Sequence, residues 1–112
     1  MKDDLIYIEH ILNSIERIEL YISDIEENTF LGDYILQDAV VRQLEIIGEA
    51  TERISMDFRL NHHEVPWADM AGMRDVLIHD YIDVDFEIVW KTVIKSIPEL
   101  KKLLVHLINK PN

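Results

Sequence analysis

The sequence predicts an all-α fold, an up-and-down bundle of four to five helices. Apolar residues recur at spacings of three and four over two long stretches, which is the period of an amphipathic helix. No stretch reads as a strand, a repeat or a low-complexity tract. Because 48% of the 112 residues are apolar, the chain can bury a core, and we expect a single helical domain over residues 1–112.

The first half of the chain is expected to form two long helices. The first covers residues 3–27, with Asp3 or Asp4 suited to its start. Its inward stripe consists of Ile8, Ile11, Leu12, Ile15, Ile18, Ile22 and Ile25. Residues 28–32 interrupt the pattern, and a second helix follows over residues 33–59. Its inward residues are Leu36, Val40, Leu44, Ile47, Ile54 and Phe58.

The second half is expected to hold the remaining helices. Residues 61–65 form a loop, and Pro66 opens a third helix because its fixed φ suits the first helical turn. Asp83 is suited to cap a fourth helix that begins near Asp85. Ser96 and Pro98 then mark a break or kink before a final apolar run.

Composition limits the classes of function. The chain has no Cys, which removes disulfides, thiolate catalysis and Cys-type zinc sites and fits a reducing cytoplasm. Its start is acidic and no apolar run approaches membrane-spanning length, so we expect a cytoplasmic protein without a membrane segment. There is no Gly-rich phosphate loop, and His62 and His63 lie in a polar loop without a third ligand. We therefore expect no cofactor and no metal.

The third helix carries the residues with the clearest chemical potential. Attack of a ribose 2′-hydroxyl on its neighbouring phosphate needs a base, an acid and positive charge on the phosphoryl oxygens. Arg74 supplies a permanent cation, and His79 an imidazole that can take either proton role. Asp75 precedes His79 by four residues on the same helical face, so its carboxylate can orient the imidazole. A two-fold dimer would supply a second imidazole, so that one acts as base and the other as acid.

Structural alternatives exist for each of these residues. His79 can be a surface histidine paired to Asp75, and Tyr81 an aromatic residue at a helix end with its hydroxyl in water. Trp67 and Trp90 either stack on nucleobases or, as is more usual at helical spacing, pack in the core. These residues alone do not decide between catalysis and structure.

Three segments in order carry a family resemblance: Arg42 to Ala50 (RQLEIIGEA), Val65-Pro66-Trp67, and the spacing Arg74, four residues, His79, one residue, Tyr81. They resemble the HepT toxins of the HEPN superfamily, small helical proteins of which many are metal-independent ribonucleases. The resemblance covers about residues 37–90. It implies a two-fold homodimer with Arg74 and His79 of both chains in a shared cleft, and an endoribonuclease activity with tRNA or mRNA as candidate targets.

The resemblance also implies a partner. In the HepT family the Tyr that corresponds to Tyr81 is the target of MntA, a nucleotidyltransferase antitoxin that attaches AMP units to it. The added charge and bulk at Tyr81 would block the place of the substrate phosphate. Many relatives carry Asn directly after the motif Arg, where this chain has Asp75. This difference keeps an alternative open: a catalytically silent HEPN subunit that binds a nucleotide or substrate for the partner transferase.

The net charge of −11 is unevenly distributed. Residues 1–85 hold six Lys or Arg against twenty Asp or Glu, whereas residues 86–112 hold five Lys against two Glu. These five residues are Lys91, Lys95, Lys101, Lys102 and Lys110. They form either a basic margin near the cleft or a solvated helix face. The Asp and Glu residues in the rest of the chain suit contact with a basic partner surface, such as that of an antitoxin.

Overall fold

The computed structural model describes residues 2–79 and 84–109, with side chains described for residues 3–73 and 84–109. Its elements in chain order are α1 (Lys2–Tyr21), α2 (Glu27–Leu31), α3 (Tyr34–Glu52), α4 (Met56–Asn61), α5 (Trp67–His79), α6 (Phe86–Lys91), the π-helical segment η1 (Thr92–Ser96) and α7 (Ile97–Asn109). No strand occurs within these ranges. The predicted all-α class is confirmed.

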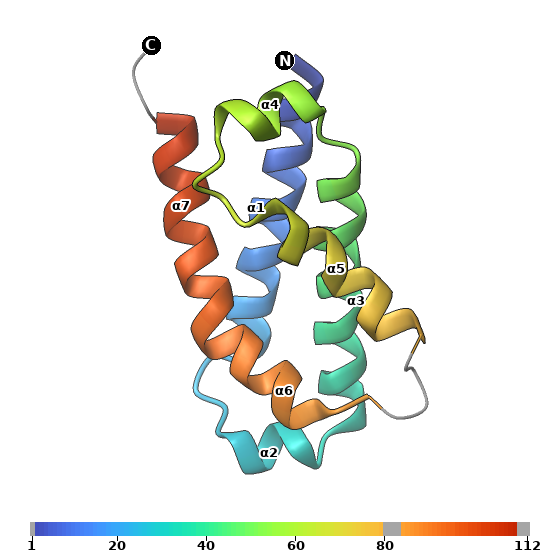
Figure 1. Cartoon of the computed structure of the whole chain (residues 1–112). Helices are drawn as coiled ribbons and strands as arrows, with labels where there is room; N and C mark the ends of the chain where they lie inside the picture. The colour runs from blue at the N-terminus through green and yellow to red at the C-terminus, as the bar shows by residue number, and fades with distance from the viewer. Residues whose placement is uncertain (1, 80–83, 110–112) are drawn as a thin grey trace.

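The described chain forms a bundle built mainly from α1, α3, α5 and the continuous run α6–η1–α7 (Figure 1). Helices α1 and α3 lie side by side and antiparallel, α7 packs against α1, and α5 crosses obliquely over α3. The short helix α4 covers the end where both termini lie, and α2 covers the opposite end. Helix α5 is therefore an outer element of the bundle, supported mainly by α3.

The core lies between these helices and follows the predicted stripes. Ile8, Ile11, Ile15 and Ile18 of α1 are completely buried, and Leu12, Ile22 and Ile25 of the same stripe pack against the core while partly exposed. From α3 and α7 the core takes Val40, Leu44, Ile47, Ile97, Leu100, Leu104 and Leu107. The periodicity of the sequence thus identified the buried faces correctly, because burial of apolar area is the main force that orients these helices.

The first predicted helix is too long. Helix α1 ends at Tyr21 rather than at residue 27, and Asp24 adopts a left-handed backbone with φ of 59°. That conformation stops an α-helix, and Asp tolerates it better than most residues. The expected break at residues 28–32 largely coincides with α2, whose Phe30 is fully buried. The side-chain amide of Gln37 donates to two carbonyl oxygens at the end of α2, at 3.0 Å each, which fixes α2 to α3.

The second predicted helix is in fact two helices. Helix α3 begins as expected with Asp33 as its cap, but it ends at Glu52, and a new cap at Ser55 opens α4. The Ser55 hydroxyl accepts a hydrogen bond from the backbone N–H of Phe58 at 3.2 Å. The carboxylate of Asp4 accepts from the backbone N–H of Ser55 at 2.7 Å and from its hydroxyl at 2.8 Å. A contact across 51 residues therefore fixes the turn between α3 and α4 to the start of α1.

The third and fourth helices start close to the predicted positions. Helix α5 begins directly after Pro66, as expected. Helix α6 begins at Phe86, and its cap is Asp85, which accepts from two backbone N–H groups of the first turn at 3.0 and 3.3 Å. The predicted cap, Asp83, lies outside the described residues, and the position of the helix start makes the assignment to Asp83 wrong.

The helical run α6–η1–α7 is not interrupted before Pro98, where the sequence predicted a break or kink. The segment η1 widens the helix by one turn of π-helix, in which the backbone N–H of Ile97 donates to the carbonyl of Thr92, five residues back. Pro98 has no N–H to donate to the carbonyl of Ile94, and the wider turn ahead of it accommodates this loss without ending the helix. None of the helices in the described ranges has the length and apolar character that a membrane crossing needs.

Candidate functional site

The first turns of α5, the helix of the predicted catalytic residues, are fixed to the core. Trp67 and Met70 are buried, with 6% and 0% of their surface exposed. The indole N–H of Trp67 donates to the backbone carbonyl of His62 at 2.9 Å, and its ring meets Phe58 edge-on with centroids 6.1 Å apart. The core interpretation of Trp67 is therefore confirmed. Burial and this hydrogen bond therefore fix the start of α5 against the core.

All of the predicted catalytic positions lie on α5. The helix continues to His79, so Arg74, Asp75 and His79 belong to one uninterrupted helix, as the spacing predicted. Asp75 and His79 are one turn apart in it, and Arg74 and His79 are separated by about 7.5 Å along the axis. The side chains of these three residues, and Tyr81 entirely, lie outside the described residues. The carboxylate–imidazole contact and the placement of the guanidinium stay predictions.

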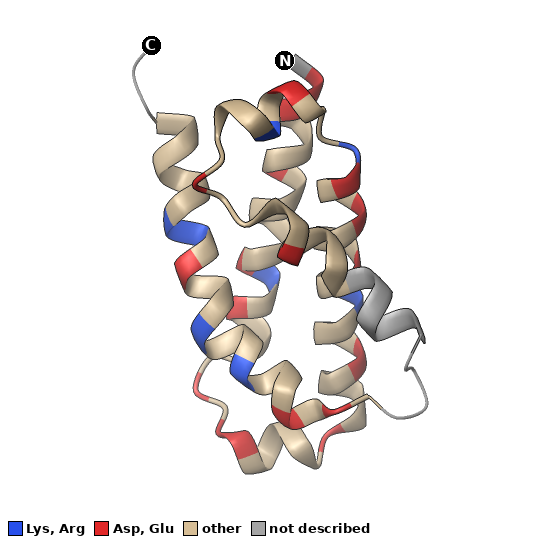
Figure 2. Ribbon diagram, viewed as in Figure 1, with Lys and Arg blue, Asp and Glu red and all other residues tan. Residues whose placement is uncertain are grey.

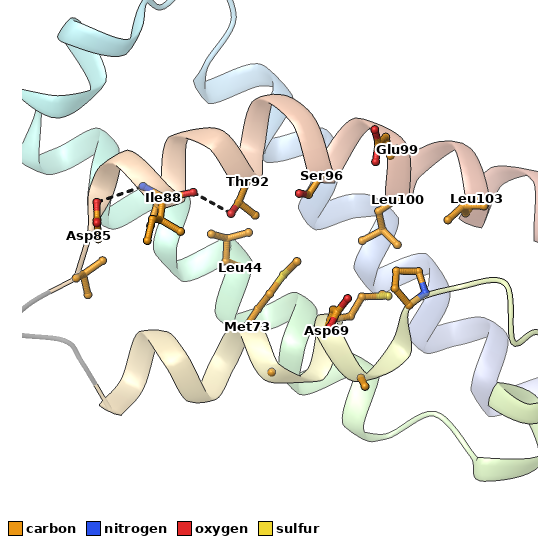
Figure 3. A pocket seen from close by; sticks show the side chains of 16 residues that line it. Leu44, Asp69, Met73, Asp85, Ile88, Thr92, Ser96, Glu99, Leu100 and Leu103 are labelled. Atoms are coloured by element: carbon orange, nitrogen blue, oxygen red, sulfur yellow. Dashed lines mark hydrogen bonds between the residues drawn. The ribbon is translucent and has the colours of Figure 1, made fainter.

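A groove with a volume of about 760 Å³ runs between α5 and the run α6–η1–α7 (Figure 3). Leu44 of α3 lies at its base, with Met73 on the α5 side and Leu100 on the α7 side. Along the second wall its lining extends from Ile88 to Leu103, which is about 20 Å of helix. We call this feature the α5–α7 groove. Its lining is mainly apolar, and its volume is in the range of small-molecule sites.

Four of the polar side chains in the α5–α7 groove fall into two groups. Asp85 caps α6, and the Thr92 hydroxyl donates to the carbonyl of Ile88 at 2.9 Å, so both are already engaged in their own helix. Asp69 on α5 and Glu99 on α7 form no hydrogen bond or ion pair with any described residue. No Lys, Arg or His is found among the described residues that line the groove. The described part of the lining therefore offers acceptors and negative charge to whatever enters the groove.

Opposite charges gather on different helices of the described chain (Figure 2). Asp and Glu are frequent on α3, while Lys residues follow the run α6–η1–α7. Lys91, Lys95 and Lys102 are exposed there. Lys101 departs from the predicted basic margin, because its ammonium donates to Glu19 of α1 at 2.8 Å. This hydrogen bond raises the pKa of Lys101, so its charge is engaged within the bundle.

The remaining candidates have structural roles. Trp90 is 7% exposed and packs on Phe30 with ring centroids 5.3 Å apart, which confirms the core interpretation. The His62 ring packs against Phe58 at an interplanar angle of 42°, with centroids 4.5 Å apart, and His63 is exposed. Within the described ranges, no group of three or more His, Asp or Glu residues is placed to hold a metal ion.

Sequence reasoning missed the α5–α7 groove. Its two walls are separated by the segment after His79, and its base comes from α3, so no local pattern joins them. One signal was available in the sequence: Ile88, Val89 and Trp90 are consecutive, so the three cannot all face the core from one helix. In the structure Ile88 is 59% exposed. A second signal was Gly72, a glycine inside a helix with no turn to make.

The fold and the helix that carries the motif define a class of protein: a helical bundle of the HEPN type, with Arg74 and His79 on one outer helix. A family model described as "Ribonuclease HepT-like" matches residues 11–107. The chain belongs to this HepT-like family, as the motif and its spacing implied.

Several relatives match over most of this chain. A protein of Thermococcus cleftensis named "Probable ribonuclease HepT" is 50% identical over 95 residues, which are 85% of this chain and 86% of that protein. A protein of Caldanaerobacter subterraneus subsp. tengcongensis named as a "Putative RNase" is 44% identical over 110 residues, 98% of each.

A longer relative matches as well. A Methanocaldococcus jannaschii protein named "Gamma-glutamylcyclotransferase and putative RNase" is 45% identical over 109 residues, 97% of this chain, and this chain spans only 49% of that protein's length. No solved structure matches the chain.

Proposed function

We propose that this protein is a metal-independent endoribonuclease, the toxin of a toxin–antitoxin pair that acts on RNA in the cytoplasm. The observation that carries the proposal is the position of Arg74 and His79 on one continuous helix of a HepT-like chain. Relatives named as ribonucleases that are 44–50% identical support it. A single helical domain over residues 1–112 carries the whole site in this proposal.

The proposed reaction is an internal transfer of a phosphodiester. One His79 ring removes the proton of a ribose 2′-hydroxyl, and the resulting oxygen attacks the adjacent phosphorus. The bond from phosphorus to the 5′-oxygen breaks, and a second His79 ring, protonated, gives its proton to that oxygen. The products are a 2′,3′-cyclic phosphate and a free 5′-hydroxyl. Arg74 holds the phosphoryl oxygens while charge builds on them, and Asp75 orients the imidazole.

The need for two imidazoles leads to a two-fold homodimer with a shared cleft. Each chain supplies one Arg74 and one His79, so a single protomer has only half of the acid–base pair. The sequence of α5 supports such a dimer, because Val76, Leu77 and Ile78 are consecutive and span about 200° of the helix circumference. The main contact of α5 within the described chain is α3. A helix that is apolar on several sides is normally covered on several sides.

The proposed partner is a nucleotidyltransferase antitoxin of the MntA type. Transfer of AMP to the Tyr81 hydroxyl forms a phosphodiester and releases pyrophosphate from ATP. The added group carries negative charge and bulk two residues after His79. It would therefore repel and obstruct an RNA phosphate at the same cleft.

A second candidate rests on the charge of the chain. The net charge of −11 and Asp75, directly after Arg74, both oppose the binding of phosphate that Arg74 favours. Both features suit a silent subunit that positions a nucleotide or substrate for the partner transferase. The two candidates differ in one measurable property, which is cleavage of RNA by the protein alone.

The test uses purified protein, total RNA and excess chelator, with the products resolved on a denaturing gel. Wild type is compared with His79→Ala and with His63→Ala, a matched control whose side chain is 89% exposed in the loop before α5. We expect discrete cuts by wild type and His63→Ala, and none by His79→Ala. Intact RNA in all three reactions at low salt, with the dimer confirmed, would establish the silent subunit instead.

A further inference from the structure

The α5–α7 groove is an open channel with a buried, apolar base. Leu44, Val89 and Leu100 are only 2–4% exposed at its bottom, whereas Ile88 at its edge is 59% exposed. The apolar lining continues for about 20 Å along the run α6–η1–α7, between Ile88 and Leu103. An amphipathic helix of about four turns, with apolar anchors at spacings of three and four, matches its full length.

We propose that the α5–α7 groove docks a basic amphipathic helix from a partner protein, with the apolar face of that helix in the groove and its cationic residues at the carboxylates of Asp69 and Glu99. Those two carboxylates lie on opposite walls, one on α5 and one on α7, and are unpaired within the described chain. Asp85 adds a third negative charge near one end of the groove. Lys or Arg on the flanks of a docked helix would meet acid on both sides.

Two other occupants fit the charges less well. The described polar faces of α1 and α3 are rich in Asp and Glu, and the helix run that carries the lysines is itself a wall of the groove. A second copy of this chain would therefore place its own carboxylates against those of Asp69 and Glu99. An RNA strand would bring its phosphates to the same unpaired carboxylates of Asp69 and Glu99. A partner helix rich in Lys or Arg avoids both conflicts.

Gly72 gives the α5 wall a gap for such a helix. A Cβ added at this position would meet no atom within 4 Å, and no described glycine has a positive φ. Glycine inside a helix lowers its stability, and no contact within the described chain requires it here. The missing side chain leaves room for a second backbone to approach α5 beside Ala68, one turn earlier. The same gap provides a test, because a Cβ added at Gly72 meets no atom within 4 Å and Gly72 lines the groove.

The test measures binding of a fluorescein-labelled synthetic helix of about four turns, with Leu at spacings of three and four and Lys elsewhere. Fluorescence anisotropy compares wild type with Gly72→Leu, which adds an apolar side chain to the groove lining without changing charge. Gly32→Leu is the matched control, since Gly32 is exposed at the end of α2 and an added Cβ there meets only carbonyl oxygens at 3.6 and 4.0 Å. Thermal unfolding confirms that each variant is folded.

We expect the peptide to bind wild type and Gly32→Leu equally, and Gly72→Leu at least about tenfold more weakly, which is about 1.4 kcal/mol. A charge control separates the groove from the general acidity of the chain. Asp69→Asn with Glu99→Gln should weaken binding more than Asp38→Asn with Glu49→Gln, which removes the same charge from exposed positions of α3. An otherwise identical peptide with Glu in place of Lys should not bind.

Several results would overturn the proposal. Absence of peptide binding to wild type, or equal affinity of Gly72→Leu and Gly32→Leu, would show that the groove does not take such a helix. If Gly72→Leu left peptide binding intact but turned a dimer into a monomer in sedimentation, the groove would belong to a second copy. If it removed binding of a short single-stranded RNA alone, the groove would belong to RNA. None of these readouts uses RNA cleavage, so the proposed nuclease and this inference fail separately.

Discussion

Replacement of Asp4 by Ala tests the contact that joins the start of α1 to the turn between α3 and α4. The Asp4 side chain is 4% exposed, and its two oxygens accept from the backbone N–H and the hydroxyl of Ser55 at 2.7 and 2.8 Å. The same Ser55 hydroxyl caps α4 by accepting from Phe58. Loss of Asp4 therefore removes both hydrogen bonds from Ser55 and loosens the cap of a second helix.

The expected cost is about 3 kcal/mol of unfolding free energy. Hydrogen bonds to a charged group contribute about 1.5–3 kcal/mol each. Two such bonds together contribute about 3–6 kcal/mol. Because Ser55 is exposed, water replaces part of the loss, and we expect the lower end of this range. For a chain of this length, 3 kcal/mol corresponds to a fall in Tm of about 12 °C.

The contribution of Asp4 also depends on pH. Burial by itself raises the pKa of the Asp4 carboxyl, but the hydrogen bonds from Ser55 oppose this effect, and the pKa lies below its usual value in the folded protein. A carboxyl with a lowered folded pKa stabilises the protein fully above its unfolded pKa of about 4. That contribution disappears as the pH falls through the folded pKa. The gap in stability between wild type and Asp4→Ala should therefore be largest at neutral pH and narrow below pH 4.

The assay is urea unfolding followed by circular dichroism, at one fixed protein concentration because a dimer would make stability depend on concentration. Asp3→Ala is the matched control, since Asp3 is the exposed neighbour on the same helix turn. We expect Asp3→Ala to stay within about 0.5 kcal/mol of wild type. Equal stability of Asp4→Ala and Asp3→Ala at pH 7, or a gap that is unchanged at pH 2, would refute the reasoning.

Three further predictions concern α5. Gly72→Ala should stabilise the protein by about 1 kcal/mol in the same unfolding assay, because alanine favours a helix and its Cβ meets nothing; a loss of stability would show that the groove is filled in the free protein. Trp67→Phe should cost about 1 kcal/mol, since it removes the donor to the carbonyl of His62 and keeps most of the packing; thermal unfolding at fixed concentration checks this, and an unchanged Tm would contradict it. In mixtures of wild type and His79→Ala that are unfolded and refolded together, RNA cleavage should fall as the square of the wild-type fraction if both imidazoles of a dimer are required, whereas a linear fall would mean that each chain acts alone.

The sequence correctly predicted the apolar stripes that repeat along a helix. It failed where a single contact between distant residues decides the structure. The isoleucine stripe of α1 and the apolar stripe of α3 are buried as expected, because a period close to 3.6 leaves each helix one face to bury. The separation of α3 from α4 was not expected, since the apolar pattern runs through both helices. It depends on Ser55, whose cap is stabilised by Asp4 at a distance of 51 residues.

The candidate site shows the same division. Arg74, Asp75 and His79 were expected on one helix, and α5 contains all three, because Pro66 starts the helix and no breaker follows before His79. The ion pair that Lys101 forms could not be predicted from its position in a lysine-rich stretch. Its pairing with Glu19 requires α7 to pack beside α1.

The sequence by itself determined the all-α class, the faces that α1, α3 and α7 bury, and the single helix that carries Arg74 and His79, since each follows from residues a few positions apart. Only the tertiary structure decided the α5–α7 groove. Its walls belong to helices that lie beside one another through their packing on α3 and α1, and its base is a residue of α3. A helix sets its own apolar face by local periodicity, whereas the space left between two helices depends on how a third holds them apart.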